Sequence, residues 1–244
     1  LGLMFFFGGT INMMSLFALI MALGITFAIY IGGIDLSAQS MANMVTVLAT
    51  VWLSSMGAWT AVACVLFGAA LGALSGFVTT RLLVPSFIST LAVGGAAYSI
   101  AQWMSDQRSV SMDAALRDST FGWMINRTAG IPNELFIAAA LLLICWFIER
   151  RTIIGRNLKA IGAGELAAVA SGVNVARYKI AAFALSGALA AFAGLLFAVK
   201  LSGGAPNVAN GFLLPAIVAV LVGGTPLTGG VGGVVNTMIG TLIV

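Results

Sequence analysis

Charged side chains are scarce in this sequence. Only 7% of the 244 residues are Asp, Glu, Lys or Arg, whereas 61% are hydrophobic and the mean hydropathy is +1.11. A typical soluble domain has about 25% charged residues. Apolar runs of about 20 residues, the length that a helix needs to cross a bilayer, recur along the chain. The scarcity of charge excludes an ordinary water-soluble protein and predicts an all-α polytopic membrane protein.

Histidine is absent and cysteine is rare. Without histidine the chain lacks the most common general base and metal ligand. Its two cysteines, Cys64 and Cys145, lie far apart within apolar runs and form no C-x-x-C motif. No lysine follows the G-x-x-x-x-G of a Walker A loop, which excludes ATP binding through that loop. We expect no metal and no cofactor in this chain, and no enzymatic catalysis by it.

Six apolar runs predict membrane-spanning helices: residues 11–31, 38–56, 58–80, 86–104, 134–149 and 179–200. A last apolar region, 212–244, is interrupted by Pro215 and by the stretch GGTPLTGG, and predicts a broken seventh and eighth span. The sequence starts with LGLMFFFGG and stops inside an apolar run, so we expect truncation at both ends. The predicted architecture is one bundle of transmembrane helices over residues 1–244.

Small residues are concentrated in the run 179–200. Gly187 and Gly194 stand among many alanines there. A face of small side chains lets helix backbones approach closely, so this run is predicted to pack tightly against its neighbours.

Two polar connections carry opposite charge balances. Residues 149–179 contain six Lys or Arg and two Glu, whereas residues 105–134 contain three Arg and four Asp or Glu. Because positive residues favour the cytoplasm, the first is predicted to be a cytoplasmic loop and the second a loop on the outer side of the membrane. Arg81, one span before the second loop, falls on the cytoplasmic side under the same assignment.

The stretch IGGIDLSAQS, residues 31–40, places a carboxylate between two predicted spans. The polar group there consists of Asp35, Ser37, Gln39, Ser40 and Asn43. An aspartate in mid-bilayer costs about 2.5–3.5 kcal/mol, so this group is expected to face protein or a water-filled path. Three roles stay open: Asp35 caps the following helix, lines a substrate path with the other polar residues, or relays protons.

The stretch LVGGTPLTGGVGG, residues 221–233, has the same character. It contains one proline and six glycines, among them Gly223, Gly224, Gly229 and Gly230. Together the two stretches predict a pair of discontinuous, glycine-broken segments that flank a translocation path. For the second stretch, a plain loop between two ordinary helices is the alternative.

Residues 164–172, GELAAVASG, predict a short helix bounded by Gly164 and Gly172 and flanked by basic residues. Its alanines leave a flat surface of small side chains that carries one carboxylate, Glu165. A helix of this kind fits a groove on a partner protein. A solvated connector is the alternative.

Three motifs in a fixed order carry a resemblance to a known family: GGIDLS after the first span, GRNLKAIGAGELAAVASGVNVARYK in the basic loop, and GGTPLTGGVGGVVNTMIGTLI near the end. They resemble the permease subunits of bacterial ABC importers for monosaccharides, the ribose-type and autoinducer-2-type branch. The resemblance implies an ABC importer permease fold and ATP-driven import of a ribose-like sugar through the inner membrane. It also implies a multi-pass chain surrounded by lipid and without nucleic acid.

The resemblance further implies a set of partners. Two permease subunits, identical or different, form the pore; separate ATPase subunits bind ATP and Mg; and a periplasmic sugar-binding protein delivers the substrate. Residues 164–172 would be the coupling helix that docks on the ATPase, through Glu165, Leu166, Ala167, Ala168 and Gly172. The chain departs from the family pattern at Ala38 and Gln39, where the family has Val-Gly, and at Gly164 and Leu166, where it often has Asn and Ala.

Two rival functions share some of these features. A permease of the related branched-chain amino acid importers has the same architecture, and Asp35 would be the only fixed charge that it offers a zwitterion. An ion-coupled secondary transporter or channel would use Asp35 as its ion site and would need no ATPase. The basic loop with its short helix argues against this second rival.

Overall fold

A computed structural model describes residues 13–244, and most of them are helical. The helices are α2 (Met13–Tyr30), α3 (Ala38–Met56), α4 (Trp59–Arg81), α5 (Ser86–Met104), α6 (Ala114–Ile125), α7 (Asn133–Arg151), α8 (Ile153–Ala163), α9 (Glu165–Ala170), α10 (Val175–Leu201), α11 (Leu213–Val222) and α12 (Val234–Ile243). Four two-residue strands form two antiparallel pairs, β1 (Val110–Ser111) with β4 (Gly203–Gly204) and β2 (Arg127–Thr128) with β3 (Ile131–Pro132). The predicted helical architecture is confirmed.

The helix bounds agree with the predicted spans to within two residues, except at the start of α10. α3 and α5 match the runs 38–56 and 86–104, while positions 11 and 12 of the run 11–31 lie outside the described residues. In the described part of the chain two helices, α4 with 23 residues and α10 with 27, are long and apolar enough to cross a membrane by themselves. α11 and α12 have ten residues each. At 1.5 Å per residue each extends about 15 Å, half the thickness of the hydrocarbon core.

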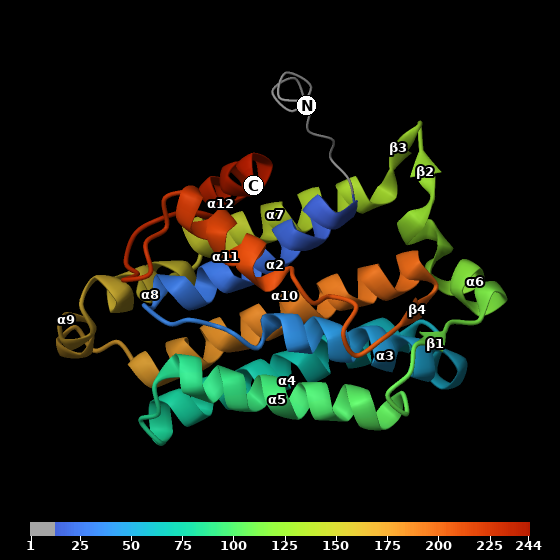
Figure 1. Cartoon of the computed structure of the whole chain (residues 1–244). Helices are drawn as coiled ribbons and strands as arrows, with labels where there is room; N and C mark the ends of the chain where they lie inside the picture. Colours follow the sequence, from blue (N-terminus) through green and yellow to red (C-terminus); the bar gives the residue numbers. More distant parts are fainter. Residues whose placement is uncertain (1–12) are drawn as a thin grey trace.

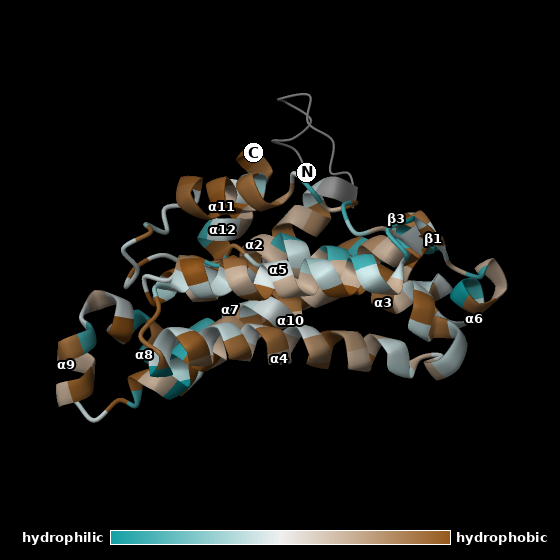
Figure 2. Cartoon of the chain, turned by 60° about the horizontal axis from the view of Figure 1, so that its bottom comes forward, coloured by the Kyte–Doolittle hydropathy of each residue, from teal (hydrophilic) through white to brown (hydrophobic). Residues whose placement is uncertain are grey.

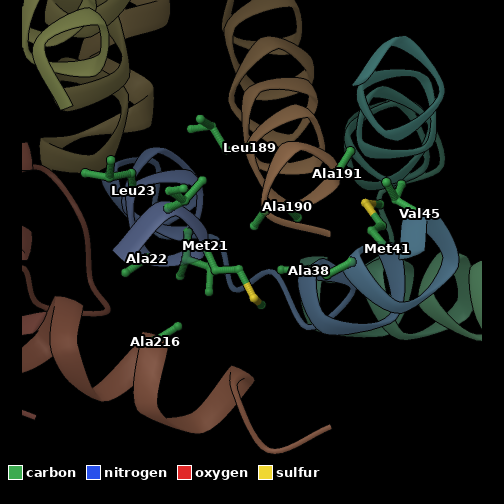
Figure 3. Packing of buried hydrophobic residues seen from close by; sticks show 14 of the residues in the cluster. Met21, Ala22, Leu23, Ala38, Met41, Val45, Leu189, Ala190, Ala191 and Ala216 are labelled. Atoms are coloured by element: carbon green, nitrogen blue, oxygen red, sulfur yellow. The ribbon is translucent and has the colours of Figure 1, made fainter. Parts of the chain in front are cut away.

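α2 and α10 form the centre of the bundle. Nearly all side chains of α2 from Leu16 to Tyr30 are buried, as expected for a helix that is apolar on every face. α10, α11, α12 and α7 surround α2, and α10 also packs against α4 and α3. Figure 3 shows side chains of four helices meeting in this core, among them Met21, Met41, Ala190 and Ala216.

Glycines let α10 lie in close contact with α4 and α3. A Cβ added to Gly72 of α4 would lie 2.1 Å from the carbonyl oxygen of Phe183, and one on Gly187 would lie 2.2 Å from that of Gly68. A Cβ on Gly194 would lie 2.4 Å from the carbonyl oxygen of Ala42. The small residues predicted to support tight packing therefore serve two different neighbours of α10.

The two polar connections lie at opposite ends of the bundle. Figure 1 shows α9 projecting at one end, and α6 with the strands at the other. An ion pair lies near each end of α7: Glu134 Oε1 is 2.5 Å from Lys200 Nζ, and Glu149 Oε1 is 2.6 Å from Lys159 Nζ. The bundle thus separates residues 105–134 from residues 149–179.

Large apolar side chains cover outer faces of the bundle. On α4 the exposed fractions are 63% for Leu66 and 47% for Phe77, and on α7 Leu143 is 62% exposed. Figure 2 shows hydrophobic residues on the outer helices α11 and α12 as well. Extended apolar surface of this kind is typical of contact with lipid or with another protein.

Candidate functional site

Asp35 lies in the irregular segment between α2 and α3 and is 1% exposed. Its Oδ1 accepts hydrogen bonds from the backbone N–H of Ser37, at 2.9 Å, and from the Ser37 hydroxyl, at 2.5 Å. Its Oδ2 accepts a bond of 2.6 Å from the hydroxyl of Ser186 on α10. Both carboxylate oxygens are therefore engaged, one at the start of α3 and one by α10.

Hydroxyl groups of α5 support the same irregular segment. The backbone N–H of Ile34 donates to Ser86 Oγ at 3.1 Å, and that of Leu36 donates to Thr90 Oγ1 at 3.2 Å. Buried backbone groups outside a helix need such partners, since no water reaches them in a membrane interior. Sequence reasoning missed Ser86, Thr90 and Ser186, because single hydroxyl residues in apolar runs do not stand out.

Polar side chains along α3 hold the segment that follows α10. Gln39 Nε2 and Asn43 Nδ2 both donate to Asn210 Oδ1, at 3.1 and 2.8 Å. Asn43 Oδ1 accepts the backbone N–H of Ala209 at 2.6 Å, and Thr46 Oγ1 accepts that of Ala205 at 3.2 Å. The amides of Gln39 and Asn43, which were predicted to line a substrate path, are thus hydrogen-bonded to the segment 205–211. In the sequence, the segment that binds these amides could have been found as the polar stretch GGAPNVANG, residues 203–211.

The two glycine-rich stretches meet directly at one junction. The N–H of Gly230 donates to the carbonyl oxygen of Tyr30 at 3.0 Å. A Cβ on Gly229 would lie 2.5 Å from the nitrogen of Gly32, and one on Gly162 of α8 would lie 2.3 Å from the nitrogen of Gly230. Here the end of α2, the connection between α11 and α12, and the helix next to α9 come together.

Gly223 and Gly224, the other two glycines that were predicted to flank the path, lie near the start of the glycine-rich stretch 221–233. Gly223 follows α11 and packs on α12, where its Cβ would lie 2.3 Å from the carbonyl oxygen of Asn236. Gly224 has a φ of +88°, and its Cβ would meet only the Asn236 amide, at 4.0 Å. These glycines shape the turn after α11, while Gly229 and Gly230 form the junction.

Gly230→Ala is expected to destabilise the fold more than Gly130→Ala. Both glycines have a positive φ, +80° and +79°, which costs an L-residue about 1–2 kcal/mol. A Cβ at Gly230 would also lie 2.7 Å from the backbone nitrogen of Ala163, whereas one at Gly130 would meet nothing within 4 Å. Thermal unfolding of the purified variants in detergent measures the difference. Equal shifts in the melting temperature would show that the junction tolerates a methyl group.

A charged cluster beside the junction was missed in the sequence. Glu149 is 5% exposed and accepts bonds from Lys159 Nζ, at 2.6 Å, and from the backbone N–H of Val234, at 2.9 Å. The Lys159 ammonium also donates to the carbonyl oxygen of Gly232 at 2.9 Å and lies 5.0 Å from the centre of the Tyr30 ring. Glu149 thereby caps α12 and connects α7 with α8.

Within residues 13–244 no group of three His, Cys, Asp or Glu side chains is placed to hold a metal ion.

The short helix α9 presents an apolar surface. Leu166 is 87% exposed and Val169 is 56% exposed, whereas Ala168 is 5% exposed and faces inward. Glu165 Oε2 pairs with Lys179 Nζ of α10 at 2.7 Å, and Gly172 ends the turn after α9 with a φ of +80°. The outward side of α9 is therefore larger and more apolar than the predicted surface of alanines.

Comparisons with known proteins agree on the kind of protein. A family model described as branched-chain amino acid transport system / permease component matches residues 9–244. The chain is 36% identical over 227 residues to the ribose import permease protein RbsC of Escherichia coli (strain K12), with 92% of this chain and 71% of the relative covered. It is also 36% identical over 228 residues to RbsC of Haemophilus influenzae, again with 92% and 71% covered.

A third relative is named for a different sugar, xylose. The chain is 30% identical over 285 residues to the xylose transport system permease protein XylH of Escherichia coli (strain K12), with 92% of this chain and 72% of the relative covered. No solved structure matches it. The resemblance to monosaccharide permeases read from three motifs is confirmed. The chain belongs to the family of integral membrane permeases described as the branched-chain amino acid transport system permease component.

Proposed function

We propose that this chain is the transmembrane permease subunit of an ATP-driven ABC importer that carries a ribose-like monosaccharide across the bacterial inner membrane. The observation that supports this most strongly is the similarity to two ribose permeases over 92% of the chain. Residues 1–244 act as one permease domain. Residues 149–179 form its cytoplasmic coupling loop and residues 105–134 its periplasmic loop.

The substrate path follows the polar side of α3. Gln39 and Asn43 carry amides suited to sugar hydroxyls, and opening of the path would require Asn210, their present partner, to move away from α3. Asp35 and Ser37 fix the start of α3 at the edge of this path. The glycine-broken segments, with Gly223, Gly224, Gly229 and Gly230 in the second, act as discontinuous spans that flank it.

The coupling helix transmits ATP-driven motion to the path. Leu166 and Val169 of α9 are exposed apolar side chains suited to a groove on the ATPase, next to Glu165 and Ala167. Ala168 faces inward beneath α9, and Gly172 forms the turn that leads from α9 to α10. From α9 the movement passes through α8 to the junction at Gly229 and Gly230. The ATPase binds ATP and Mg, a periplasmic binding protein delivers the sugar, and a second permease subunit completes the pore.

The environment of Asp35 favours a sugar over an amino acid. The carboxylate is 1% exposed and accepts bonds from Ser37 and Ser186, so its charge is buried where an ammonium group or an ion does not reach it. Sugars need hydrogen-bonding groups rather than a fixed charge, and the amides of Gln39 and Asn43 would provide them after releasing residues 209–211. This argument stands against both the amino acid permease and the ion-coupled transporter.

Replacing Leu166 and Val169 together by aspartate is expected to reduce retention of the ATPase at least tenfold. Two aspartates in an apolar groove would bury charges without partners, which costs well over the roughly 1.4 kcal/mol that corresponds to tenfold. The measurement is co-purification of the full-length permease in detergent with the ATPase encoded beside it. The control is Trp123→Asp with Ile131→Asp, which changes two exposed apolar residues, 56% and 41% exposed, at the opposite end.

Equal retention by both double variants would contradict the coupling role of α9. Failure of the unmodified protein to retain any ATPase would contradict the importer function itself. Both variants change exposed side chains, so their yield and thermal stability are expected to match those of the unmodified protein. Ala168 is unsuitable for this test, because it is 5% exposed and a larger side chain would displace α9.

A further inference from the structure

A pocket of about 360 Å³ lies where α7 ends, α8 begins and α12 starts. Its lining includes Glu149, Arg150, Arg156 and Lys159. Glu149 and Lys159 are engaged with each other and with backbone groups of residues 232 and 234. Arg150 and Arg156 are exposed, and neither side chain forms a hydrogen bond or an ion pair in the described part of the chain. The pocket therefore offers two guanidinium groups without partners.

The N-terminus of α12 adds to the positive potential of this pocket. α12 begins at Val234, and the pocket is lined by Val235 and Asn236 of its first turn. The N–H groups at the start of a helix attract anions, with a partial charge of about half a proton. Glu149 supplies negative charge here, but Lys159 balances it at 2.6 Å. The net charge of the pocket is therefore the charge of the two unpaired arginines, Arg150 and Arg156.

A separate apolar crevice lies further along the same two helices. It has a volume of about 200 Å³ between α2, α7 and α12, and Ala139 and Leu142 of α7 and Met238 and Leu242 of α12 contribute to its lining. α7 and α12 are in contact and run antiparallel, since Glu149 near the end of α7 bonds to Val234 at the start of α12. Figure 1 shows α12 beside α7, with α8 at their shared end. Leu142 of the crevice and Glu149 of the pocket are seven residues apart on α7, so the crevice begins about 10 Å from the pocket along that helix.

From this arrangement we propose a binding site for an anionic phospholipid. Arg150 and Arg156 bind its phosphate, with the α12 N-terminus beside it, and an acyl chain lies in the crevice along α7 and α12. A charged pocket with an apolar crevice about 10 Å further along the same helix fits the headgroup and acyl chain of a phospholipid. A free anion would use only the basic end, and an acidic protein surface would not fill the crevice. The site rests on membrane insertion; its placement in the cytoplasmic leaflet rests on the proposed function.

The site has a second consequence for the permease. Its residues surround the cluster of Glu149 and Lys159 that connects α7, α8 and α12. A lipid held by Arg150 of α7 and Arg156 of α8 would join the helix next to α9 to the body of the bundle. Bound lipid is therefore expected to stabilise the folded permease, because it binds only the native arrangement of the three helices.

The test compares lipid binding to Arg150→Gln with Arg156→Gln, to a matched control, Arg108→Gln with Arg127→Gln, and to Ala139→Trp. Arg108 and Arg127 are exposed arginines in the connection at the other end of the bundle, and Ala139 is an exposed residue that lines the crevice. Full-length permease in complex with its ATPase is purified in detergent and titrated with phosphatidylglycerol, phosphatidylcholine or inorganic phosphate. Native mass spectrometry reports the bound lipid, and thermal unfolding reports stabilisation.

We expect phosphatidylglycerol to bind and to raise the melting temperature, with phosphatidylcholine and phosphate giving no shift. Each arginine near an anionic lipid headgroup contributes about fivefold in affinity, so the Arg150 and Arg156 double variant should bind phosphatidylglycerol about 25-fold more weakly. Ala139→Trp should also weaken binding, by filling the crevice, and the control should bind as the unmodified protein does. Unchanged binding by the arginine double variant would overturn the proposal. So would stabilisation by phosphate alone, or loss of the ATPase from that variant without loss of lipid.

Discussion

Gly72→Leu is expected to abolish assembly of the bundle at 37 °C, or to lower its stability by more than about 3 kcal/mol. Overpacking a core typically costs about 1–3 kcal/mol. At this position the Cβ alone would lie 2.1 Å from the carbonyl oxygen of Phe183 and 2.9 Å from its carbonyl carbon. Both atoms belong to the backbone of α10, so no side-chain rotation relieves the clash. The helices α4 and α10 would have to move apart.

Gly95→Leu is the matched control for this prediction. Gly95 lies inside α5, and a Cβ there would meet nothing within 4 Å, so the substitution keeps the change in side chain and helix propensity but removes the clash. Leucine is a better helix former than glycine by up to about 1 kcal/mol, so this variant should be neutral or slightly more stable. Thermal unfolding in detergent and the yield of folded protein measure both variants. Similar melting temperatures would contradict the close approach of α4 and α10.

The helices could be predicted from the sequence because their limits are local. Apolar runs bounded by glycine, proline and polar residues gave the bounds of α3 and α5 without error. α10 begins four residues before the predicted run, at Val175, because Asn174 caps it by accepting the N–H of Arg177 at 3.2 Å. A hydrophobicity pattern does not register a polar capping residue that is followed by a basic residue. The predicted start of α10 was therefore too late.

The contacts between the irregular segments could not be predicted in the same way. The bond from Ser186 to Asp35 joins residues 151 positions apart, and the meeting of Gly32 with Gly229 joins two glycines whose spacing carries no periodic signal. Their closeness depends on how α2, α8 and the connection between α11 and α12 fold together. The sequence indicated that both glycine-rich stretches interrupt helices. It did not indicate that they meet, or that the amides of α3 would bind Asn210.

Asp35→Ala is expected to destabilise the permease by at least about 3 kcal/mol. The substitution removes the acceptor of three donors: the N–H and hydroxyl of Ser37 and the hydroxyl of Ser186. Hydrogen bonds to a charged group contribute about 1.5–3 kcal/mol each, and buried donors left without a partner cost more. Asp118→Ala is the control, since the side chain of Asp118 is 60% exposed and pairs only at the surface. That variant should unfold within about 0.5 kcal/mol of the unmodified protein.

Asp35→Asn separates the structural role of this residue from an ionic one. The amide keeps an oxygen for the N–H and hydroxyl of Ser37, and its nitrogen can donate to the Ser186 hydroxyl, which is able to accept. We therefore expect a loss of about 1 kcal/mol and uptake of labelled sugar, by cells or by vesicles that contain ATP, within a few-fold of normal. An ion-coupled transporter needs the charge itself, so it predicts loss of all coupled uptake by a protein of nearly normal stability. Such a loss would contradict the importer mechanism, because the carboxylate would then act through its charge and not through the three donors that it holds.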